Sequence, residues 1–467
     1  MRTNFLLSTD SYKFTHWKQY PAGTTHVYSY LESRGGMFAQ TVFFGLQYYL
    51  KHYLQGSVFN RGDIDQAEDF CRQHFRHEGY FNRAGWEFVL QKHGGRLPLK
   101  IMAVPEGTVV PVSNVLMTVE NTDPSCPWLT NYLETLLLKV WYPITVATLS
   151  YEMKKMFRHF LELSGDPSLL PFKVHDFGYR GVSSEETAAI GGAAHLINFQ
   201  GTDTVAGIEM LKNFYGAVAM PGFSVPAAEH STITAWGKEG EADAYRNMLT
   251  QFPEGIVARV SDSYDILKAC AEIWGTQLRQ AVLDRNGLLV IRPDSGDPRR
   301  VLLEVFQILS ERFGFEMNSK GYRVLNPKVR VIQGDGINYW TMGDILTAIT
   351  KSGWSADNLA FGIGGALLQQ LNRDTQKFAL KCSSVTVNGV QREVHKDPAT
   401  DHAKASKPGR LALVRRSQHL ETISLGPQSH LDDDLLQTVF LNGELVKEYS
   451  LEEIRSRASE VPCQSVI

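Results

Sequence analysis

A strand–loop–helix unit recurs along the middle of the chain, from about residue 170 to about residue 380, and it constrains the fold more than any other feature. In each copy a short apolar run leads into a loop rich in Gly and Asp, and a helical pattern follows. These loops lie at residues 175–181, 292–297, 333–336 and 362–365. Such repetition predicts parallel strands joined by right-handed crossovers, and hence an α/β barrel or a doubly wound sheet. In either architecture ligands bind at the carboxyl ends of the strands, where all of these loops fall.

Both ends of the chain are β-rich instead. Residues 25–30 alternate in polarity as a half-buried strand does. Toward the other end, Asn388-Gly389 and Asn442-Gly443 each follow a β-prone run, and Asn-Gly favours the tight turn of a β-hairpin. Since β-rich segments flank the α/β middle, we expect a discontinuous second domain. The expected domains are residues 1–150 together with 382–467, and residues 151–381.

Helical spacing of apolar residues predicts helices over residues 129–140 and 146–163, separated at Pro143. Ser261 or Asp262 can cap a later helix. The buried face of that helix would consist of Ile266, Ala269, Cys270, Ile273 and Trp274.

Composition excludes several classes of protein. The 467 residues carry a formal net charge of −3, which argues against nucleic acid or an anionic membrane as a bulk partner. The 5 cysteines are scattered without a CxxC pair, so neither a disulfide framework nor a structural zinc site is expected. No apolar run is long enough for a signal peptide core or a membrane span, and we expect a cytoplasmic protein.

The strand-end loops hold the side chains with chemical potential. Asp294 and Asp335 each follow an apolar strand, where a carboxylate can accept two ribose hydroxyls or help to hold Mg²⁺, or can instead cap a helix. Gly364 and Gly365 let backbone N–H groups approach an anion, although the same pattern also fits a tight strand-to-helix turn. No Walker A, HExxH or GxSxG motif occurs.

Arg180 and Arg292 occupy matching positions in two of these loops. A guanidinium offers a rigid fork of donors for phosphate, and the alternative is a surface ion pair. His230 follows a carboxylate, Glu229, in a stretch of small residues, where a histidine is either a functional group or a satisfied core residue. Phe177 is interpreted first as a core residue. Together, two arginines, two aspartates and a glycine loop at strand ends describe a sugar-phosphate site.

Several of these loops also carry strings typical of one family, at residues 9–13, 175–181, 201–204, 226–232, 260–265, 291–296, 332–336 and 364–365. The chain resembles the nicotinamide phosphoribosyltransferases from end to end. That resemblance implies a type II phosphoribosyltransferase fold, an irregular α/β barrel with a β-rich domain drawn from both chain ends, assembled as a homodimer. It also implies transfer of a phosphoribosyl group from 5-phosphoribosyl 1-pyrophosphate to nicotinamide, giving nicotinamide mononucleotide and pyrophosphate for NAD salvage.

The resemblance assigns the residues that would hold the nicotinamide ring. Phe177 would stack on one face of the pyridine, and Tyr12 from the other subunit would stack on the opposite face. Asp203 would accept the carboxamide N–H, although Asp in Gly-Thr-Asp-Thr is otherwise a common turn residue. Because the carboxylate of nicotinic acid would meet this carboxylate, at a cost of about 4 kcal/mol at about 4 Å, nicotinamide is the favoured substrate.

The resemblance also assigns the ribose and phosphate contacts. Asp294 would bind the ribose hydroxyls, with Asp335 close to the same sugar. The 5′-phosphate would lie on Gly334, Gly364 and Gly365. Arg180 and Arg292 would hold phosphate groups, joined from the partner subunit by Arg373 and Lys381.

Two further ligands are implied. His230 matches the histidine that ATP phosphorylates in the family, and Glu229 beside it would orient the imidazole. Mg²⁺ would neutralise the departing pyrophosphate, bound with it and not on a dedicated set of protein ligands. The pyridine nitrogen is already a free nucleophile, so no general base is expected.

Departures from the family and rival functions remain open. Ala379 stands where a hydroxyl residue is expected, and Lys396, Lys404 and Arg410 lie in a basic loop that either borders the partner's site or forms a solvated face. The nearest rival function is a nicotinate phosphoribosyltransferase, with Asp203 as the discriminating residue. The others are a catalytically silent binding protein on the same scaffold and a phosphate-binding barrel enzyme such as an aldolase.

Overall fold

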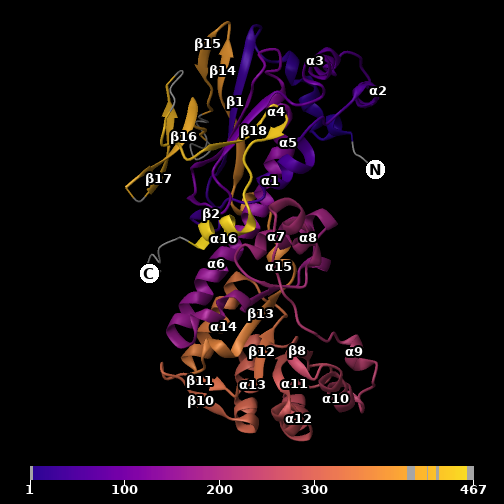
Figure 1. Cartoon of the computed structure of the whole chain (residues 1–467), viewed down its shortest axis with the longest axis vertical. Helices are drawn as coiled ribbons and strands as arrows, with labels where there is room; N and C mark the ends of the chain where they lie inside the picture. The colour runs from indigo at the N-terminus through magenta and orange to yellow at the C-terminus, as the bar shows by residue number, and fades with distance from the viewer. Residues whose placement is uncertain (1–3, 397–404, 418, 427–430, 460–467) are drawn as a thin grey trace. The chain divides into compact units, whose positions relative to one another are not determined.

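The computed structural model describes residues 4–396, 405–417, 419–426 and 431–459, and it separates into two compact units (Figure 1). The first unit combines Met1–Thr148, Leu211–Ala217 and Leu371–Ile467, and the second combines Leu149–Met210 and Val218–Gln370. None of the described helices has the length and apolar character that a membrane crossing needs.

The second unit is built on a parallel six-stranded sheet in the order β7-β6-β13-β12-β9-β8. Helices follow the strands, as the repeating unit predicts: α13 (Pro298–Phe313) follows β9, α14 (Tyr339–Lys351) follows β12, and α15 (Gly365–Leu368) follows β13. The strands are β6 (Val174–Asp176), β7 (Gly201–Thr202), β8 (Glu254–Val260), β9 (Asn286–Arg292), β12 (Val329–Gln333) and β13 (Leu359–Ile363).

A short extended segment joins the two edges of this sheet. Phe223 forms a parallel bridge with Gly201 on β7, and Ala227 forms one with Ala258 on β8. The backbone N–H of Thr202 donates to the Phe223 carbonyl over 3.0 Å, and the N–H of Ala228 donates to the Ala258 carbonyl over 3.0 Å. Because one segment pairs with both edge strands, the sheet curves into an irregular α/β barrel. The predicted fold class is therefore confirmed.

The remaining elements of the second unit flank the sheet. A small hairpin, β10 (Phe315–Met317) with β11 (Arg323–Leu325), precedes β12. The helices are η5 (Pro167–Phe172), η6 (Tyr179–Gly181), α7 (Glu185–Leu196), the part of α8 (Val205–Tyr215) up to Met210, α9 (Ser231–Thr234), α10 (Glu241–Gln251), α11 (Ile266–Lys268), the π-helical η7 (Ala269–Gln277), α12 (Arg279–Asp284) and η8 (Ala356–Asn358).

The first unit contains a seven-stranded antiparallel sheet in the order β15-β14-β1-β5-β3-β18-β19. Both Asn-Gly pairs form the predicted hairpin turns, with positive φ of 50° at Asn388 and 51° at Asn442. The strands are β1 (Thr24–Ser33), β3 (Leu99–Ala103), β5 (Val115–Asn121), β14 (Phe378–Val387), β15 (Val390–Glu393), β18 (Gln437–Leu441) and β19 (Glu444–Leu445).

Further short pairs and helices complete the first unit. The paired strands are β2 (Gln40–Val42) with β4 (Val109–Pro111), and β16 (Arg410–Arg416) with β17 (His419–Leu425). The helices are η1 (Phe5–Leu7), η2 (Ser11–Lys18), α1 (Leu46–Tyr49), η3 (Leu50–Leu54), α2 (Arg61–Phe75), α3 (Arg83–His93), η9 (Arg373–Thr375) and α16 (Leu451–Ser459).

The expected boundary at residue 381 falls inside β14. That strand pairs with β1 along its length, from Phe378 opposite Ser33 to Val387 opposite Thr24, so it cannot be divided between two units. Leu211–Ala217 also belongs to the first unit.

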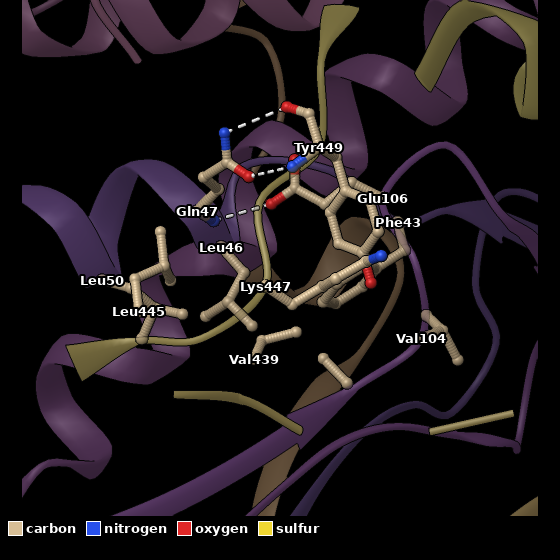
Figure 2. A pocket seen from close by; sticks show the side chains of 11 residues that line it. Phe43, Leu46, Gln47, Leu50, Val104, Glu106, Val439, Leu445, Lys447 and Tyr449 are labelled. Carbon is tan, nitrogen blue, oxygen red and sulfur yellow. Dashed lines mark hydrogen bonds between the residues drawn. The ribbon is translucent and has the colours of Figure 1, made fainter. Parts of the chain in front are cut away.

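Buried Glu106 links separate segments of the first unit (Figure 2). Its carboxylate accepts the backbone N–H of Gly45 over 3.1 Å and of Gln47 over 2.7 Å, at the start of α1. The Gln47 side chain in turn exchanges hydrogen bonds with the backbone of Tyr449 and donates to the carbonyl of Phe214 over 2.7 Å. The Glu106 carboxylate and the Gln47 amide therefore hold together α1, the 211–217 segment and the backbone at Tyr449.

Two helix predictions are wrong in detail. Residues 129–140 do not form one helix but α4 (Leu129–Tyr132), α5 (Glu134–Leu137) and η4 (Leu138–Val140). Next, α6 (Trp141–Ser164) begins before Pro143, because proline is tolerated in the first turn, where its missing N–H has no helical acceptor.

The predicted helix cap after β8 is wrong as well. Asp265, not Ser261 or Asp262, caps α11, accepting the N–H of Leu267 and Lys268 over 3.0 Å each. The apolar face expected there is confirmed: Ile266, Ala269, Cys270, Ile273 and Trp274 are all buried.

Candidate active site

The carboxyl ends of the six strands in the second unit bring the candidate polar residues to one edge of the sheet. Since the strands are parallel, the loops that follow them emerge on the same side. This edge collects Asp176 at the end of β6 and Phe177 after it, Asp203 after β7, Asp262 after β8, Arg292 at the end of β9 and Asp294 after it, Gly334 and Asp335 after β12, and Gly364 and Gly365 after β13.

Phe177 is half-buried at the end of β6 and is not a core residue. Its ring lies against the His175 ring, with centroids 4.7 Å apart and planes tilted by 44°. A Cβ on Gly362 of the neighbouring β13 would come within 2.2 Å of Phe177 Cε2. The Phe177 ring therefore occupies the space that a side chain at residue 362 would fill.

Gly362→Ala is expected to lower the free energy of unfolding by about 1–3 kcal/mol, because the new methyl group must displace the Phe177 ring. Gly365→Ala is the matched control for stability, since a Cβ there meets no atom within 4 Å. Urea denaturation of both variants measures the difference. Equal stability of the two variants would contradict the packing described.

The Asp203 side chain is held by two other side chains. Its carboxylate accepts a hydrogen bond from His175 Nε2 over 2.9 Å and another from the Ser224 hydroxyl. Partial burial disfavours the charged form, but the two hydrogen bonds and the charges of His175 and Arg292 outweigh it and hold the pKa of Asp203 below its ordinary value. The Asp203 carboxylate is therefore held in its ionised form next to His175, whose ring lies against Phe177.

His230 is exposed and lies outside the core, so the core interpretation is wrong. Its Nε2 lies 3.0 Å from Asp262 Oδ1, and because a carboxylate only accepts, Nε2 donates. The other oxygen, Asp262 Oδ2, accepts the backbone N–H of Asp294 over 3.0 Å and the hydroxyl of Ser295 over 2.6 Å. The Asp262 side chain, only 4% exposed, thus connects the histidine to the loop after β9.

Neither Asp294 nor Asp335 caps a helix. Asp297 caps α13 and Asn338 caps α14, which leaves the two carboxylates available for a ligand. Burial is the main cause that raises the pKa of Asp294; Arg292 opposes it, and the neighbouring Asp262 and Asp335 add to it. Arg292 Nε lies 3.8 Å from Asp294 Oδ1, and it is buried without a hydrogen-bond partner. Several acidic groups therefore lie close together at this edge, and a bound cation would reduce the repulsion between their negative charges.

Glycines let these loops approach each other. A Cβ on Gly334 would lie 3.0 Å from Asp294 Oδ1, and one on Gly181 would lie 3.3 Å from the Cα of Gly365. A Cβ on Gly364 would make an ordinary contact of 3.7 Å with the Phe177 carbonyl oxygen, and one on Gly365 would meet no atom within 4 Å, so packing does not explain these two glycines. Arg180 is exposed in the loop after β6.

Three predicted site residues lie in the first unit instead. Tyr12 is on η2 with 57% of its surface exposed, Arg373 begins η9, and Lys381 lies on β14. Burial, followed by the charges of Arg34, Lys396 and Arg373, lowers the pKa of Lys381, against the opposing charge of Glu134. Lys381 therefore lies within the electrostatic influence of these basic side chains and of Glu134.

The structure describes only some of the other residues of the basic loop. Arg410 pairs with Glu120 through two hydrogen bonds of 2.7 Å, so it is a structural ion pair. Lys404 lies outside the described residues. Ala379 pairs with Glu32 across β1 and β14.

Sequence reasoning missed His175, Ser224 and Asp262 as site residues. His175 and Asp262 lie within strand-end strings, so the strand-end rule could have marked them. Ser224 lies in the segment that joins the sheet edges, and no local pattern announces it.

Two solved structures resemble this chain in fold. Crystal structures of nicotinate-nucleotide pyrophosphorylase from Pyrococcus furiosus and of human nicotinic acid phosphoribosyltransferase match with TM-scores of 0.61 and 0.54. The first match covers 98% of this chain and 96% of that chain at 16% identity, and the second covers 96% and 92% at 17% identity. The fold is that of a type II phosphoribosyltransferase.

Sequence comparison is more specific. Residues 172–444 match the nicotinate phosphoribosyltransferase (NAPRTase) family, and residues 4–101 match the N-terminal domain of nicotinamide phosphoribosyltransferase. The chain is 53% identical to the nicotinamide phosphoribosyltransferase of Xanthomonas campestris, over 97% of this chain and 98% of the relative. It is 35% identical to that of Acinetobacter baylyi, over 98% of both. The chain belongs to the nicotinamide phosphoribosyltransferase family of enzymes.

Proposed function

We propose that the protein transfers the phosphoribosyl group of 5-phosphoribosyl 1-pyrophosphate to nicotinamide, giving nicotinamide mononucleotide and pyrophosphate. The observation that carries the choice of base is the charged Asp203 carboxylate, which is bonded to His175, whose ring lies against Phe177. The names of the relatives agree with this choice.

The pyridine ring stacks on Phe177, and Tyr12 of the partner subunit closes its other face. Offset stacking adds about 0.5–1.5 kcal/mol beyond burial and fixes the ring nitrogen toward the ribose carbon. Asp203 accepts the carboxamide N–H. Nicotinic acid instead brings a second negative charge to the same carboxylate, at a cost of about 4 kcal/mol at about 4 Å.

The sugar-phosphate lies along the neighbouring strand ends. Asp294 accepts ribose hydroxyls with Asp335 nearby, Gly334, Gly364 and Gly365 hold the 5′-phosphate, and Arg180 and Arg292 neutralise phosphate oxygens. Arg373 and Lys381 of the partner subunit add positive charge. As pyrophosphate leaves, positive charge develops on the ribose, and the ionised carboxylates stabilise it. The pyridine nitrogen then bonds to the ribose carbon without losing a proton, so no general base is required.

Mg²⁺ would enter with the pyrophosphate and not on a dedicated set of protein ligands, since the described residues hold no cluster of three side chains suited to a metal ion. Mg²⁺ bound to pyrophosphate would neutralise the leaving group, and Asp294 and Asp335 have the oxygen ligands it prefers.

ATP is the proposed co-substrate at His230. The exposed imidazole accepts the γ-phosphoryl group and ADP leaves, while Asp262 orients the ring through the Nε2 hydrogen bond. Hydrolysis of that phosphohistidine is coupled to synthesis of the mononucleotide.

The assembly proposed is a homodimer, with each site completed by the partner subunit. The second unit exposes a group of apolar side chains that an interface would cover: Phe172, Val205, Val218, Met220 and Phe223. We place the reaction in the cytoplasm, where scattered, odd-numbered cysteines are ordinary.

Nicotinamide mononucleotide formation from nicotinamide, 5-phosphoribosyl 1-pyrophosphate and Mg²⁺ tests the proposal, with the native protein compared to Asp203→Asn. We expect the native protein to prefer nicotinamide, and Asp203→Asn to lose roughly a hundredfold of that preference or more, because the amide no longer repels the acid. An unchanged preference in Asp203→Asn would contradict the role of Asp203.

A further inference from the structure

We propose that Tyr179 and Glu185 are positioning residues for the phosphate-bearing substrate, and that they act through Arg180, which lies between them in the loop after β6. The hydrogen bond between their side chains closes this loop over residues 179–185 and holds the Arg180 backbone at the carboxyl edge of the sheet. This inference rests on the proposed function, in which Arg180 neutralises phosphate oxygens of 5-phosphoribosyl 1-pyrophosphate.

The loop begins at a fixed point. Phe177, the residue after β6, donates its backbone N–H to the Ile363 carbonyl of β13 over 2.9 Å. The next N–H, that of Gly178, donates to Oδ1 of the buried Asp176 over 2.7 Å. A Cβ on Gly178 would also come within 2.7 Å of the Leu368 side chain on α15, so the chain packs closely against that helix here. The main chain is therefore anchored as far as residue 178.

Beyond residue 178 the chain turns toward the glycine loop after β13. The N–H of Gly181 donates to the Gly178 carbonyl over 2.9 Å, which forms the single turn η6. A Cβ on Gly181 would lie 3.3 Å from the Cα of Gly365, so this turn runs beside the loop to which we assign the 5′-phosphate. Arg180 lies in the turn and is exposed.

The Tyr179 hydroxyl spans the loop. It donates to Oε2 of Glu185, the first residue of α7. That hydrogen bond is the largest cause that raises the pKa of Tyr179, so the phenol keeps its proton and remains the donor. A hydrogen bond to an ionised carboxylate is roughly twice as strong as one between neutral groups. Side chains thus join the two ends of the loop, with Arg180 between them.

Glu185 is a firm anchor because the start of α7 is fixed by a cap and by burial. Ser184 caps the helix, and its hydroxyl accepts the backbone N–H of Thr187 over 3.1 Å. The helix then buries Ala188 and every residue from Ile190 to Leu196. Helix α15 contacts both α7 and η6. The bond from Tyr179 therefore ties an exposed turn to a buried element.

Loss of this bond should free Arg180 while leaving the anchored residues in place. Tyr179→Phe keeps the ring and removes only the hydroxyl. Because part of the binding free energy is then consumed in ordering the loop, the KM for 5-phosphoribosyl 1-pyrophosphate is expected to rise roughly tenfold, with a smaller change in kcat. The KM for nicotinamide should stay near native, since Phe177 is held by the Ile363 carbonyl.

The experiment measures initial rates of nicotinamide mononucleotide formation over a range of 5-phosphoribosyl 1-pyrophosphate concentrations. Glu185→Ala should raise the KM as Tyr179→Phe does. Glu185→Gln keeps an oxygen acceptor for the phenol, so it should retain a near-native KM although it removes a charge. Glu272→Ala, which alters an exposed ion pair with Lys268, is the control and should behave as the native protein.

A further variant tests whether the pair acts through Arg180. In an Arg180→Ala protein, addition of Tyr179→Phe should change the KM for 5-phosphoribosyl 1-pyrophosphate by less than about twofold, because the group that the bond positions is gone. A general loss of folding would instead add to the effect of Arg180→Ala, and it would lower the midpoint of urea denaturation.

Three results would overturn the inference while leaving the proposed function intact. They are a native KM in Tyr179→Phe, a KM that falls in Glu185→Gln through the loss of a charge that repels phosphate, and an undiminished effect of Tyr179→Phe in the Arg180→Ala protein. Failure of the native protein to make nicotinamide mononucleotide would overturn the proposed function and this inference with it.

Discussion

Asp262→Asn is expected to slow phosphorylation of His230 by roughly a hundredfold or more. An asparagine can keep its oxygen on the Asp294 N–H and the Ser295 hydroxyl, which turns its NH₂ toward His230 Nε2. That contact requires an unprotonated Nε2, so the neutral imidazole carries its proton on Nδ1 instead. The lone pair that Nδ1 has in the native protein is then lost, and the wrong tautomer lowers the rate of a histidine-dependent reaction strongly. The charge that stabilises an imidazolium is also lost.

Transfer of labelled phosphoryl groups from ATP to the protein measures this effect, alongside nicotinamide mononucleotide synthesis without ATP. Synthesis without ATP should fall only a few-fold, because the loop after β9 keeps its hydrogen bonds. Asp243→Asn, which alters an exposed ion pair with Arg246, serves as the control and should behave as the native protein. Native-like phosphorylation of Asp262→Asn would contradict the role given to Asp262.

The second large effect concerns stability and pH. Burial is the largest cause that raises the pKa of Glu106 to about 7, against hydrogen bonds that lower it. A raised folded-state pKa means that this contribution to stability is full below about pH 4.5 and is lost as the pH rises through about 7. The change amounts to about 3 kcal/mol in the free energy of unfolding.

Glu106→Gln removes this titration and one of the two acceptors for the Gly45 and Gln47 N–H groups. Near pH 5 we expect the variant to be about 2 kcal/mol less stable than the native protein. Toward about pH 8 the difference should shrink, since only the native protein then bears a buried charge.

Urea denaturation across this pH range, with amide hydrogen exchange at Gly45 and Gln47, measures the difference. Glu444→Gln is the matched control, because Glu444 is exposed and its pair with Arg96 is at the surface. A deficit for Glu106→Gln that grows with rising pH would contradict the assigned direction.

Local chemistry predicted which strand-end loops meet at one edge of the sheet, but not the hydrogen bonds between them. The loops after β6, β9, β12 and β13 can be predicted because each follows a short apolar strand. Since parallel strands end on the same side of a sheet, these loops are then expected at one edge. The sequence cannot tell which aspartate after β8 caps the helix, since Asp262 and Asp265 have the same capping chemistry. The chain path decides it, and it gives the cap to Asp265 and the contact with His230 to Asp262.

Sequence patterns also do not reveal the long-range contacts that close the barrel and assign segments to the two units. Residues 223–227 pair with both edges of the sheet through single bridges, too few to leave an alternating pattern, and they include Pro226. Likewise, the 211–217 segment joins the first unit because Gln47 reaches the Phe214 carbonyl, a contact between residues 167 positions apart. Such pairings depend on the completed fold.

The most direct test of the central claim is a competition between the two bases. The native protein is incubated at about pH 8 with 5-phosphoribosyl 1-pyrophosphate, Mg²⁺, ATP and equal amounts of nicotinamide and nicotinic acid, and the products are identified by mass. We predict nicotinamide mononucleotide as the dominant product, formed faster with ATP than without it. Nicotinic acid mononucleotide as the dominant product would contradict the account.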